Sequence, residues 1–280
     1  MHSPIELALH KVLDDFTVGK KTMSSSTINA ITKDIKVALK KQFVDGKPGF
    51  RFRLSSLGKP SCQLWFDKNK PETALPKPST FIFNMILGDI LEAVFKGFLR
   101  EANVEFKDSS KVTLALGKDK IAGTYDLVID DDVDDIKTAS DWSYRNKFDS
   151  FSTLKENDSF GYIGQLSAYA KAGNYNPGGW WVINKNNCSF KYVPATGIEI
   201  EKEITILKNT VDKVKENKFE RCFDAVNETF RGKETGNKIL DKTCSFCSYR
   251  KECWTDVKEL PSIPSSAKQP KIVSYVYIKE

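Results

Sequence analysis

The stretch from Gly123 to Ser140 constrains the fold more than any other part of the sequence. It reads GTYDLVID, then an acidic turn at Asp130–Asp132, then VDDIKTAS. Two strand-like runs on either side of a short polar turn predict antiparallel neighbouring strands. Residues two apart on a strand share a face, so we expect Asp135 and Lys137 to lie side by side.

This predicted hairpin brings acidic groups together. Asp126 on the first strand is expected to face Asp135, with the two side chains only a few ångströms apart. Two converging carboxylates attract a hard divalent cation such as Mg²⁺, and a lysine beside them can hold a water or a phosphate oxygen. Such a set suits metal-assisted hydrolysis of a phosphodiester. The alternative is a solvated acidic turn with a weak surface ion pair.

Residues 80–104, TFIFNMILGDILEAVFKGFLREANV, predict a long helix because apolar residues recur at helical spacing. Glu92 stands on this otherwise apolar helix, one turn after Gly88, where there is space beside it. Glu92 is therefore either a residue at the edge of the apolar stripe or a third carboxylate of the acidic site.

Strands and helices alternate along the chain in an order that predicts an α/β protein. A central mixed sheet flanked by helices is expected, with a helical lobe formed by both chain ends. The expected segments are an N-terminal helical segment over 1–80, a core over 81–200, a helix and cysteine segment over 201–256, and an extended arm over 257–280.

The bulk composition is that of a folded, mildly basic protein. The 280 residues carry a net charge of +6, which permits a polyanionic partner without requiring one. No apolar run reaches membrane-spanning length and the N-terminus lacks a signal-peptide pattern, so we expect a cytoplasmic protein. In that reducing compartment, six cysteines are expected to be thiols or metal ligands rather than disulfides.

Three cysteines cluster near the C-terminus as C-x2-C-x5-C, namely Cys244, Cys247 and Cys253. A tetrahedral metal site needs a fourth ligand, for which Cys62 is the candidate and Cys222 the weaker one. Cys188, on a predicted strand, is expected to be a buried free thiol, and the same is expected of Cys222 if it binds no metal. The cysteine spacing leaves both zinc and iron–sulfur ligation open.

Four elements in order resemble the RecB-type PD-(D/E)XK nucleases. They are the helix with Glu92, then GTYD (123–126), DIK (135–137) and QLSAY (165–169). The resemblance implies a restriction-endonuclease-like core over 81–200. Glu92 takes the position of a histidine that this family usually has, and lambda-type exonucleases use a glutamate from an equivalent helix.

The resemblance also implies roles for the motif residues. The expected ligands of catalytic Mg²⁺ or Mn²⁺ are Glu92, Asp126, Asp135 and the backbone carbonyl of Ile136. Lys137 is expected to orient or activate the nucleophile. Gln165 and Tyr169, one helical turn apart, are expected to position the scissile DNA backbone.

One cysteine before the core and three after it is an arrangement similar to that of the iron–sulfur branch of these nucleases, which includes AddB and the CRISPR-associated RecB-like exonucleases. This similarity implies a structural 4Fe–4S cluster held by Cys62, Cys244, Cys247 and Cys253, with Zn²⁺ as the alternative. The cluster would join the two ends of the chain.

The expected function is that of a metal-dependent DNA exonuclease acting on single strands or DNA ends. The context implied by the resemblance is recombination, repair or DNA turnover in a bacterial or phage-infected cell. The stretch FRFRLSSLGK (50–59) offers phosphate contacts, and Trp142 and Tyr144 offer stacking surfaces. The sequence has no major-groove reading motif and no P-loop. The alternatives are a DNA-binding module with weak or no cleavage, or an assembly subunit of a helicase or recombinase complex. The expected partner protein is a recombinase, a helicase or a single-strand-binding protein.

Overall fold

The computed structural model describes residues 3–45 and 49–280. They divide into two compact units. The first combines residues up to Gly58 with Ser79–Lys208, and the second combines Lys59–Pro78 with Asn209–Glu280. Among the described helices, none is long and apolar enough to cross a membrane.

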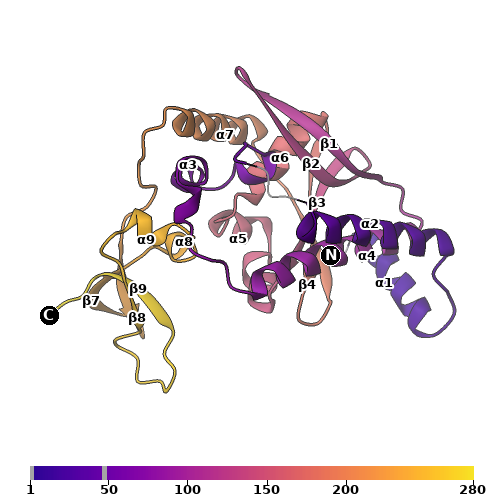
Figure 1. The fold of residues 1–280 in the computed structure, drawn as a ribbon. Coiled ribbons are helices and arrows are strands. Elements are labelled where there is room, and N and C mark those ends of the chain that lie inside the picture. The colour runs from indigo at the N-terminus through magenta and orange to yellow at the C-terminus, as the bar shows by residue number, and fades with distance from the viewer. Residues whose placement is uncertain (1–2, 46–48) are drawn as a thin grey trace. The chain divides into compact units, whose positions relative to one another are not determined.

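A mixed five-stranded sheet forms the centre of the first unit (Figure 1). Its strands, in spatial order, are β1 (Lys107–Leu116), β2 (Asp119–Ile129), β3 (Asp132–Ala139), β4 (Asn176–Asn184) and β5 (Phe190–Pro194). β3 and β4 run parallel, and every other neighbouring pair is antiparallel. The predicted α/β class and the predicted β2–β3 hairpin are therefore confirmed.

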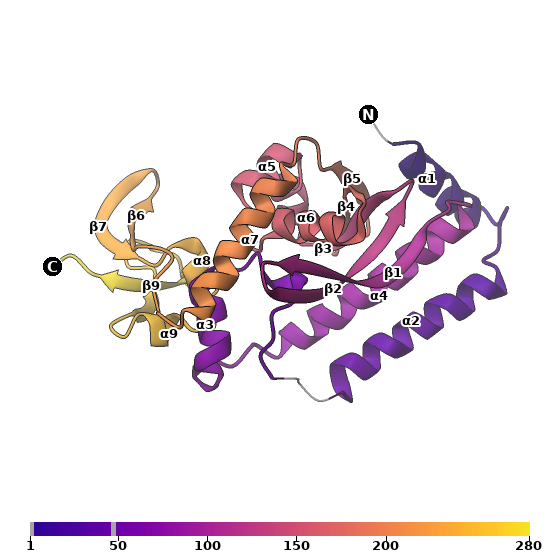
Figure 2. The ribbon, with the colours of Figure 1, turned by 90° about the horizontal axis from the view of Figure 1, so that it is seen from above.

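Helices lie on both faces of this sheet (Figure 2). The helices of this unit are α1 (Pro4–Thr17), α2 (Ser25–Phe43), α4 (Thr80–Glu101), α5 (Phe151–Glu156), α6 (Tyr162–Gly173) and the part of α7 (Ile200–Lys215) up to Lys208, with short helical turns at Leu54–Ser56 and Ser143–Lys147. α4 covers one face of the sheet, and α1 and α2 pack against α4. α6 covers the other face. Ser24 caps α2 by accepting a hydrogen bond from the N–H of Thr27.

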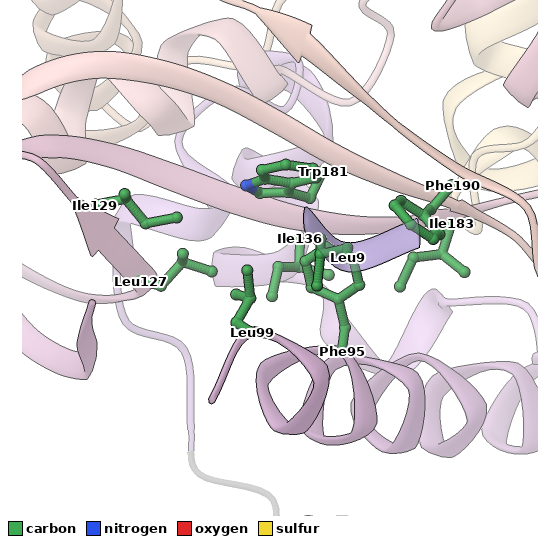
Figure 3. Packing of buried hydrophobic residues seen from close by; sticks show 9 residues of the cluster. All are labelled: Leu9, Phe95, Leu99, Leu127, Ile129, Ile136, Trp181, Ile183 and Phe190. Carbon is green, nitrogen blue, oxygen red and sulfur yellow. The ribbon is translucent and has the colours of Figure 1, made fainter. Parts of the chain in front are cut away.

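The hydrophobic core between the sheet and α4 fixes which residues face the other side. Figure 3 shows this cluster, which consists of Leu9, Phe95, Leu99, Leu127, Ile129, Ile136, Trp181, Ile183 and Phe190. Burial of each large side chain contributes about 1.5–3 kcal/mol. Because strand side chains alternate, placing Leu127 and Ile136 in this core directs Asp126, Asp135 and Lys137 away from it.

Asp134 is a buried carboxyl group on the core side of β3. Trp181 Nε1 donates to it at 3.1 Å and the hydroxyl of Tyr192 at 2.9 Å. Burial raises the pKa of Asp134 to about 7, although both hydrogen bonds oppose the rise. Asp134 is thus part of the framework and lies on the face opposite to Asp135.

The second unit contains a four-stranded antiparallel sheet and short helices. Its elements are α3 (Ser61–Asn69), a turn at Pro71–Thr73, β6 (Val226–Phe230), β7 (Lys233–Ile239), α8 (Lys242–Ser245), α9 (Arg250–Cys253), β8 (Lys258–Pro261) and β9 (Ile272–Tyr277). The strand order is β6-β7-β9-β8. Phe66 of α3 stacks on Tyr249 with ring centroids 5.0 Å apart, and the Tyr249 hydroxyl donates to Asp67 at 2.7 Å. These contacts join residues 59–78 to the C-terminal part of the chain.

The organisation of the chain ends differs from the prediction in two respects. α1 and α2 pack in the first unit, because Leu9 and its neighbours bury their apolar face against α4 and the sheet. Residues 257–280 are not an extended arm, since they form β8 and β9. Val273 and Tyr275 of β9 are buried, and the Tyr275 hydroxyl donates to the buried carboxylate of Glu228 at 2.8 Å. The Pro/Ser-rich segment before β9 concealed this strand pattern in the sequence.

Candidate functional site

The acidic site forms where the β2–β3 ladder ends. The strand pairing stops with Leu127 opposite Asp134, so Asp126 and Asp135 stand at the next position. There the N–H of Ile136 donates to Oδ2 of Asp126 at 2.8 Å, in place of a backbone carbonyl of the neighbouring strand. The carboxylate of Asp126 is thereby held between the two strands.

Asp135 and Lys137 form an ion pair on the face of β3 that is turned away from the core. Lys137 Nζ lies 2.6 Å from Oδ2 of Asp135, which is almost fully buried. The ammonium of Lys137 balances one negative charge, while Asp126 and Glu92 bring further carboxyl groups to the same place. A divalent cation would offset the remaining negative charge. This chemistry fits a metal ligand.

The carboxyl groups of the site raise one another's pKa. Burial and the negative charge of Asp135 raise the pKa of Asp126 to about 6. Burial and the charge of Asp126 raise the pKa of Glu92 to about 7, although Lys96 opposes the rise. Burial also raises the pKa of Asp135, with Lys137 opposing. A concentration of negative charge of this kind is typical of functional sites.

Lys137 remains a cation at neutral pH. Burial by itself would lower the pKa of Lys137, but the charges of Asp135 and Asp126 outweigh burial and raise it. The lysine therefore supplies a fixed positive charge at the acidic pair.

Lys96 is a residue of the site that the sequence analysis did not identify. Its buried Nζ lies 2.8 Å from Oε1 of Glu92 and 3.2 Å from Oδ1 of Asp108. The spacing of Glu92 and Lys96, four residues apart on one helix, was the available signal. Lys96 compensates part of the negative charge that Glu92 and Asp126 bring together.

α6 contributes the groups on the other side of Lys137. Nε2 of Gln165 donates to the hydroxyl of Tyr169 at 3.1 Å, and Lys137 Nζ donates to Oε1 of Gln165 at 3.4 Å. The Tyr169 ring packs so closely on Gly123 that a Cβ there would lie 2.8 Å from it. The sequence analysis also missed Tyr162, whose ring centroid lies 5.0 Å from Lys137 Nζ, three residues before Gln165. The three strand and helix motifs thus meet at Lys137.

The predicted nucleic-acid contacts are partly exposed. In residues 50–59, Arg51 and Arg53 are exposed while Leu54 is buried. The Trp142 side chain is exposed. The Tyr144 ring already has a cation against its face, because Lys191 Nζ lies 4.5 Å from the ring centroid. Their role in binding remains a prediction.

The second unit brings the four predicted cysteine ligands to one pocket. Cys62, Cys244, Cys247 and Cys253 line it together with Trp254 and other residues, and its volume is about 20 Å³. That space corresponds to roughly one water molecule. The residue types fit a metal centre, but the cysteines enclose little space between them in this arrangement.

The thiols of this pocket are held in the neutral form. Burial and the neighbouring Cys253 raise the pKa of Cys244 to about 12, and burial raises the pKa of Cys247 and Cys253. Cysteine binds metal as the thiolate, so a bound cation would have to displace these protons.

Cys222 and Cys188 differ from the prediction that they are buried, since both are exposed. Cys222 lies beside the first turn of α3, and its Sγ accepts a hydrogen bond from the N–H of Cys62 in that turn at 3.1 Å. A hydrogen bond from the Cys62 thiol lowers the pKa of Cys222 to about 6. Cys188 lies in the turn between β4 and β5 with a φ of 60°, because β5 begins only at Phe190.

Within residues 3–45 and 49–280, no three or more His, Cys, Asp or Glu side chains converge closely enough to hold a metal ion as they stand. The carboxylates of the first unit and the cysteines of the second are therefore not preformed metal cages. Metal binding at either place stays a prediction.

Comparisons with known proteins cover family models, curated proteins and solved structures. No model of a protein family matches the sequence. No curated protein matches it either. Among solved structures, the chain is similar to one titled "Crystal structure of SSO0001", with a TM-score of 0.45 and 15% sequence identity. The alignment covers 78% of this chain and 92% of that one.

Proposed function

We propose that the chain is a metal-dependent DNA nuclease of the RecB-type PD-(D/E)XK kind, acting as an exonuclease on single strands or DNA ends. One observation carries the proposal. At the end of the β2–β3 ladder, Asp126 lies beside Asp135, a buried carboxylate that pairs with Lys137. One lysine does not balance two neighbouring carboxylates, whereas a divalent cation would.

The groups that would hold the catalytic Mg²⁺ or Mn²⁺ are Glu92, Asp126, Asp135 and the carbonyl of Ile136. A divalent cation bound there lowers the pKa of an attacking water and stabilises charge on the leaving oxygen. The raised pKa values of Glu92 and Asp126 support this assignment, because such carboxyl groups gain most from a cation.

The chain's own cationic and polar residues then orient the substrate. Lys137, always protonated, holds a phosphate oxygen or the nucleophilic water as a point charge. Gln165 accepts a hydrogen bond from Lys137 Nζ, and Tyr169 fixes the Gln165 amide in turn. In this arrangement Gln165 of α6 orients the ammonium group of Lys137, whose backbone is fixed in β3.

We propose further that Cys62, Cys244, Cys247 and Cys253 hold a structural 4Fe–4S cluster, with Zn²⁺ as the alternative. The support is that all four line one pocket of the second unit. Such a centre would join α3 to the segment of α8 and α9, as thiolate-bound metals do in small folds. Metal analysis and a visible absorption spectrum of anaerobically purified protein distinguish iron from zinc.

The biological setting follows from the same proposal. A nuclease of this kind suits recombination, repair or DNA turnover in a bacterial or phage-infected cell. A helicase, recombinase or single-strand-binding protein would be its partner.

The test is a cleavage time course on end-labelled single-stranded and duplex DNA with Mg²⁺, Mn²⁺ or EDTA. We expect metal-dependent shortening that Asp135→Ala and Lys137→Ala abolish while DNA binding is retained. The matched control is Asp131→Asn, since Asp131 is an exposed acid of the same hairpin that pairs with Lys107, and asparagine tolerates its φ of 63°. Cleavage that persists in both site variants would show that the assignment is wrong.

A second candidate is a DNA-binding module that does not cleave. The observation in its favour is that Glu92, in place of the family's histidine, is already paired with Lys96 at 2.8 Å. DNA binding without cleavage under either metal, by a folded protein, would select this candidate.

A further inference from the structure

Three aromatic rings form a row next to the acidic site. Tyr162 is the middle ring, at the start of α6. Phe148 stacks on it with centroids 5.8 Å apart and planes 24° apart. Phe160 stacks on it with centroids 5.7 Å apart and planes 19° apart. Near-parallel, offset rings at these distances are in a favourable stacking geometry.

The row leads from the interior to the surface. Phe148 is 2% exposed, Tyr162 is partly buried, and Phe160 is 60% exposed. Phe160 is therefore the ring of the row that solvent reaches most. A row of stacked rings that ends in an exposed ring offers a surface on which one more flat ring can stack.

Positive charge accompanies the row. Lys147 Nζ lies 4.4 Å from the centroid of Tyr162 and 4.9 Å from that of Phe160. Lys137 Nζ lies 5.0 Å from the centroid of Tyr162 and 2.6 Å from Oδ2 of Asp135. Phe160 is therefore separated from the lysine of the acidic site by a single ring, that of Tyr162.

The nearby start of α6 is not available to an anion. Oδ1 and Oδ2 of Asp158 accept hydrogen bonds from the N–H groups of Tyr162 and Ile163, at 2.8 and 2.9 Å. This carboxylate occupies the helix N-terminus and would repel a phosphate placed there. The surface at Phe160 thus suits the flat, uncharged part of a nucleotide better than its phosphate.

We propose that Phe160 is a stacking platform for an unpaired nucleobase of the DNA strand bound at Lys137. The inference rests on the proposed nuclease function and deepens it, because it specifies single-stranded DNA or a frayed end as the substrate. A base can cover Phe160 only when its own face is not already covered by a neighbour in a duplex. Stacking on aromatic side chains tolerates any base, which agrees with binding that does not depend on sequence.

The test measures base stacking directly in a protein that cannot cleave. Full-length Asp135→Ala chain is titrated with a single-stranded oligonucleotide that carries one 2-aminopurine, whose fluorescence falls when it stacks on a ring. Phe160→Leu keeps the apolar bulk of the side chain and removes the aromatic face. Phe43→Leu is the matched control, since Phe43 is a 58% exposed phenylalanine on α2.

We expect the fluorescence of 2-aminopurine to fall on binding to Asp135→Ala. Phe160→Leu should abolish this fall and weaken single-strand binding roughly tenfold. Phe160→Trp should retain both properties, Phe43→Leu should change neither, and duplex affinity should be the same for all variants. Rescue by tryptophan excludes a fold defect as the cause.

Cleavage is assayed separately in the chain with native Asp135, which keeps the two proposals distinguishable. A chain that cleaves DNA but whose single-strand affinity and 2-aminopurine signal do not respond to Phe160→Leu overturns the stacking platform and leaves the nuclease intact. A chain that stacks the base at Phe160 but cleaves with neither metal supports the platform and overturns the nuclease.

Discussion

The acidic site of the first unit and the cysteine pocket of the second use different means to hold their groups. At the acidic site, strand register and direct hydrogen bonds fix Asp126, and buried ammonium groups of Lys96 and Lys137 offset the negative charge. In the cysteine pocket, neutral thiols surround a space of about 20 Å³ and contribute few directional bonds. A framework of sheet and helices thus holds a charged site by itself, whereas the proposed cysteine centre would hold the smaller unit through a bound metal.

The largest expected effect tests that dependence. Cys244→Ser combined with Cys247→Ser should destabilise the second unit by several kcal/mol, on the order of 10 for a fully metal-dependent unit, and leave the first unit folded. Hydrogen exchange resolved along the chain measures both units at once. The control is Cys188→Ser, which changes an exposed cysteine in a turn. Unchanged protection of β6–β9 in the double variant would show that no metal supports this unit.

The second prediction concerns pH. The pKa values of Glu92 and Asp134 are raised to about 7 and that of Asp126 to about 6, so the folded chain binds protons that the unfolded chain has released. The contribution of these three groups to the free energy of unfolding should therefore be highest below about pH 4 to 5. It should fall as the pH rises to about 7. The expected loss is on the order of 4 kcal/mol, since partial exposure weakens the shifts.

Urea unfolding at several pH values, with and without Mg²⁺, checks this prediction. Mg²⁺ should restore the part of the loss that belongs to Glu92 and Asp126, because a cation at the site replaces their protons. It should leave the part that belongs to Asp134, which lies on the other face of β3. A pH profile that Mg²⁺ does not alter would contradict metal binding at the acidic site.

The third prediction removes one compensating charge. Lys96→Met leaves Glu92 and Asp108 without their shared cation and should cost about 2–3 kcal/mol at pH 7.5, less than for a fully buried pair because Glu92 is partly exposed. Adding Glu92→Gln should recover much of this loss, and a double-mutant cycle in urea measures the coupling. Strictly additive changes would mean that Lys96 does not compensate Glu92.

The smallest expected effect tests the close packing of two motifs. Gly123→Ala places a Cβ 2.8 Å from the Tyr169 ring and 2.7 Å from Cβ of Leu54, so we expect a loss of about 1–3 kcal/mol and reduced cleavage. Thr124→Ala, an exposed change on the same strand, is the control. Equal melting temperatures for the two variants would show that Tyr169 and α6 can move without cost.

The sequence by itself determined the local parts of this protein. Alternation and a polar turn gave β2 and β3, helical spacing gave α4, and the distances between motif residues placed Asp126, Asp135, Lys137 and Gln165 in the right order on these elements. These features could be predicted because a strand or a helix fixes the face of each side chain from sequence spacing alone.

Only the tertiary structure decided what depends on contacts between distant segments. The sequence placed 257–280 in an arm, but β9, which buries Val273 and Tyr275, pairs with β7 from an earlier part of the chain as well as with β8. Lys96 and the row of rings that ends at Phe160 lie next to the acidic residues through packing between elements. Their placement depends on which surfaces are buried together, and burial is a property of the whole fold rather than of any local pattern.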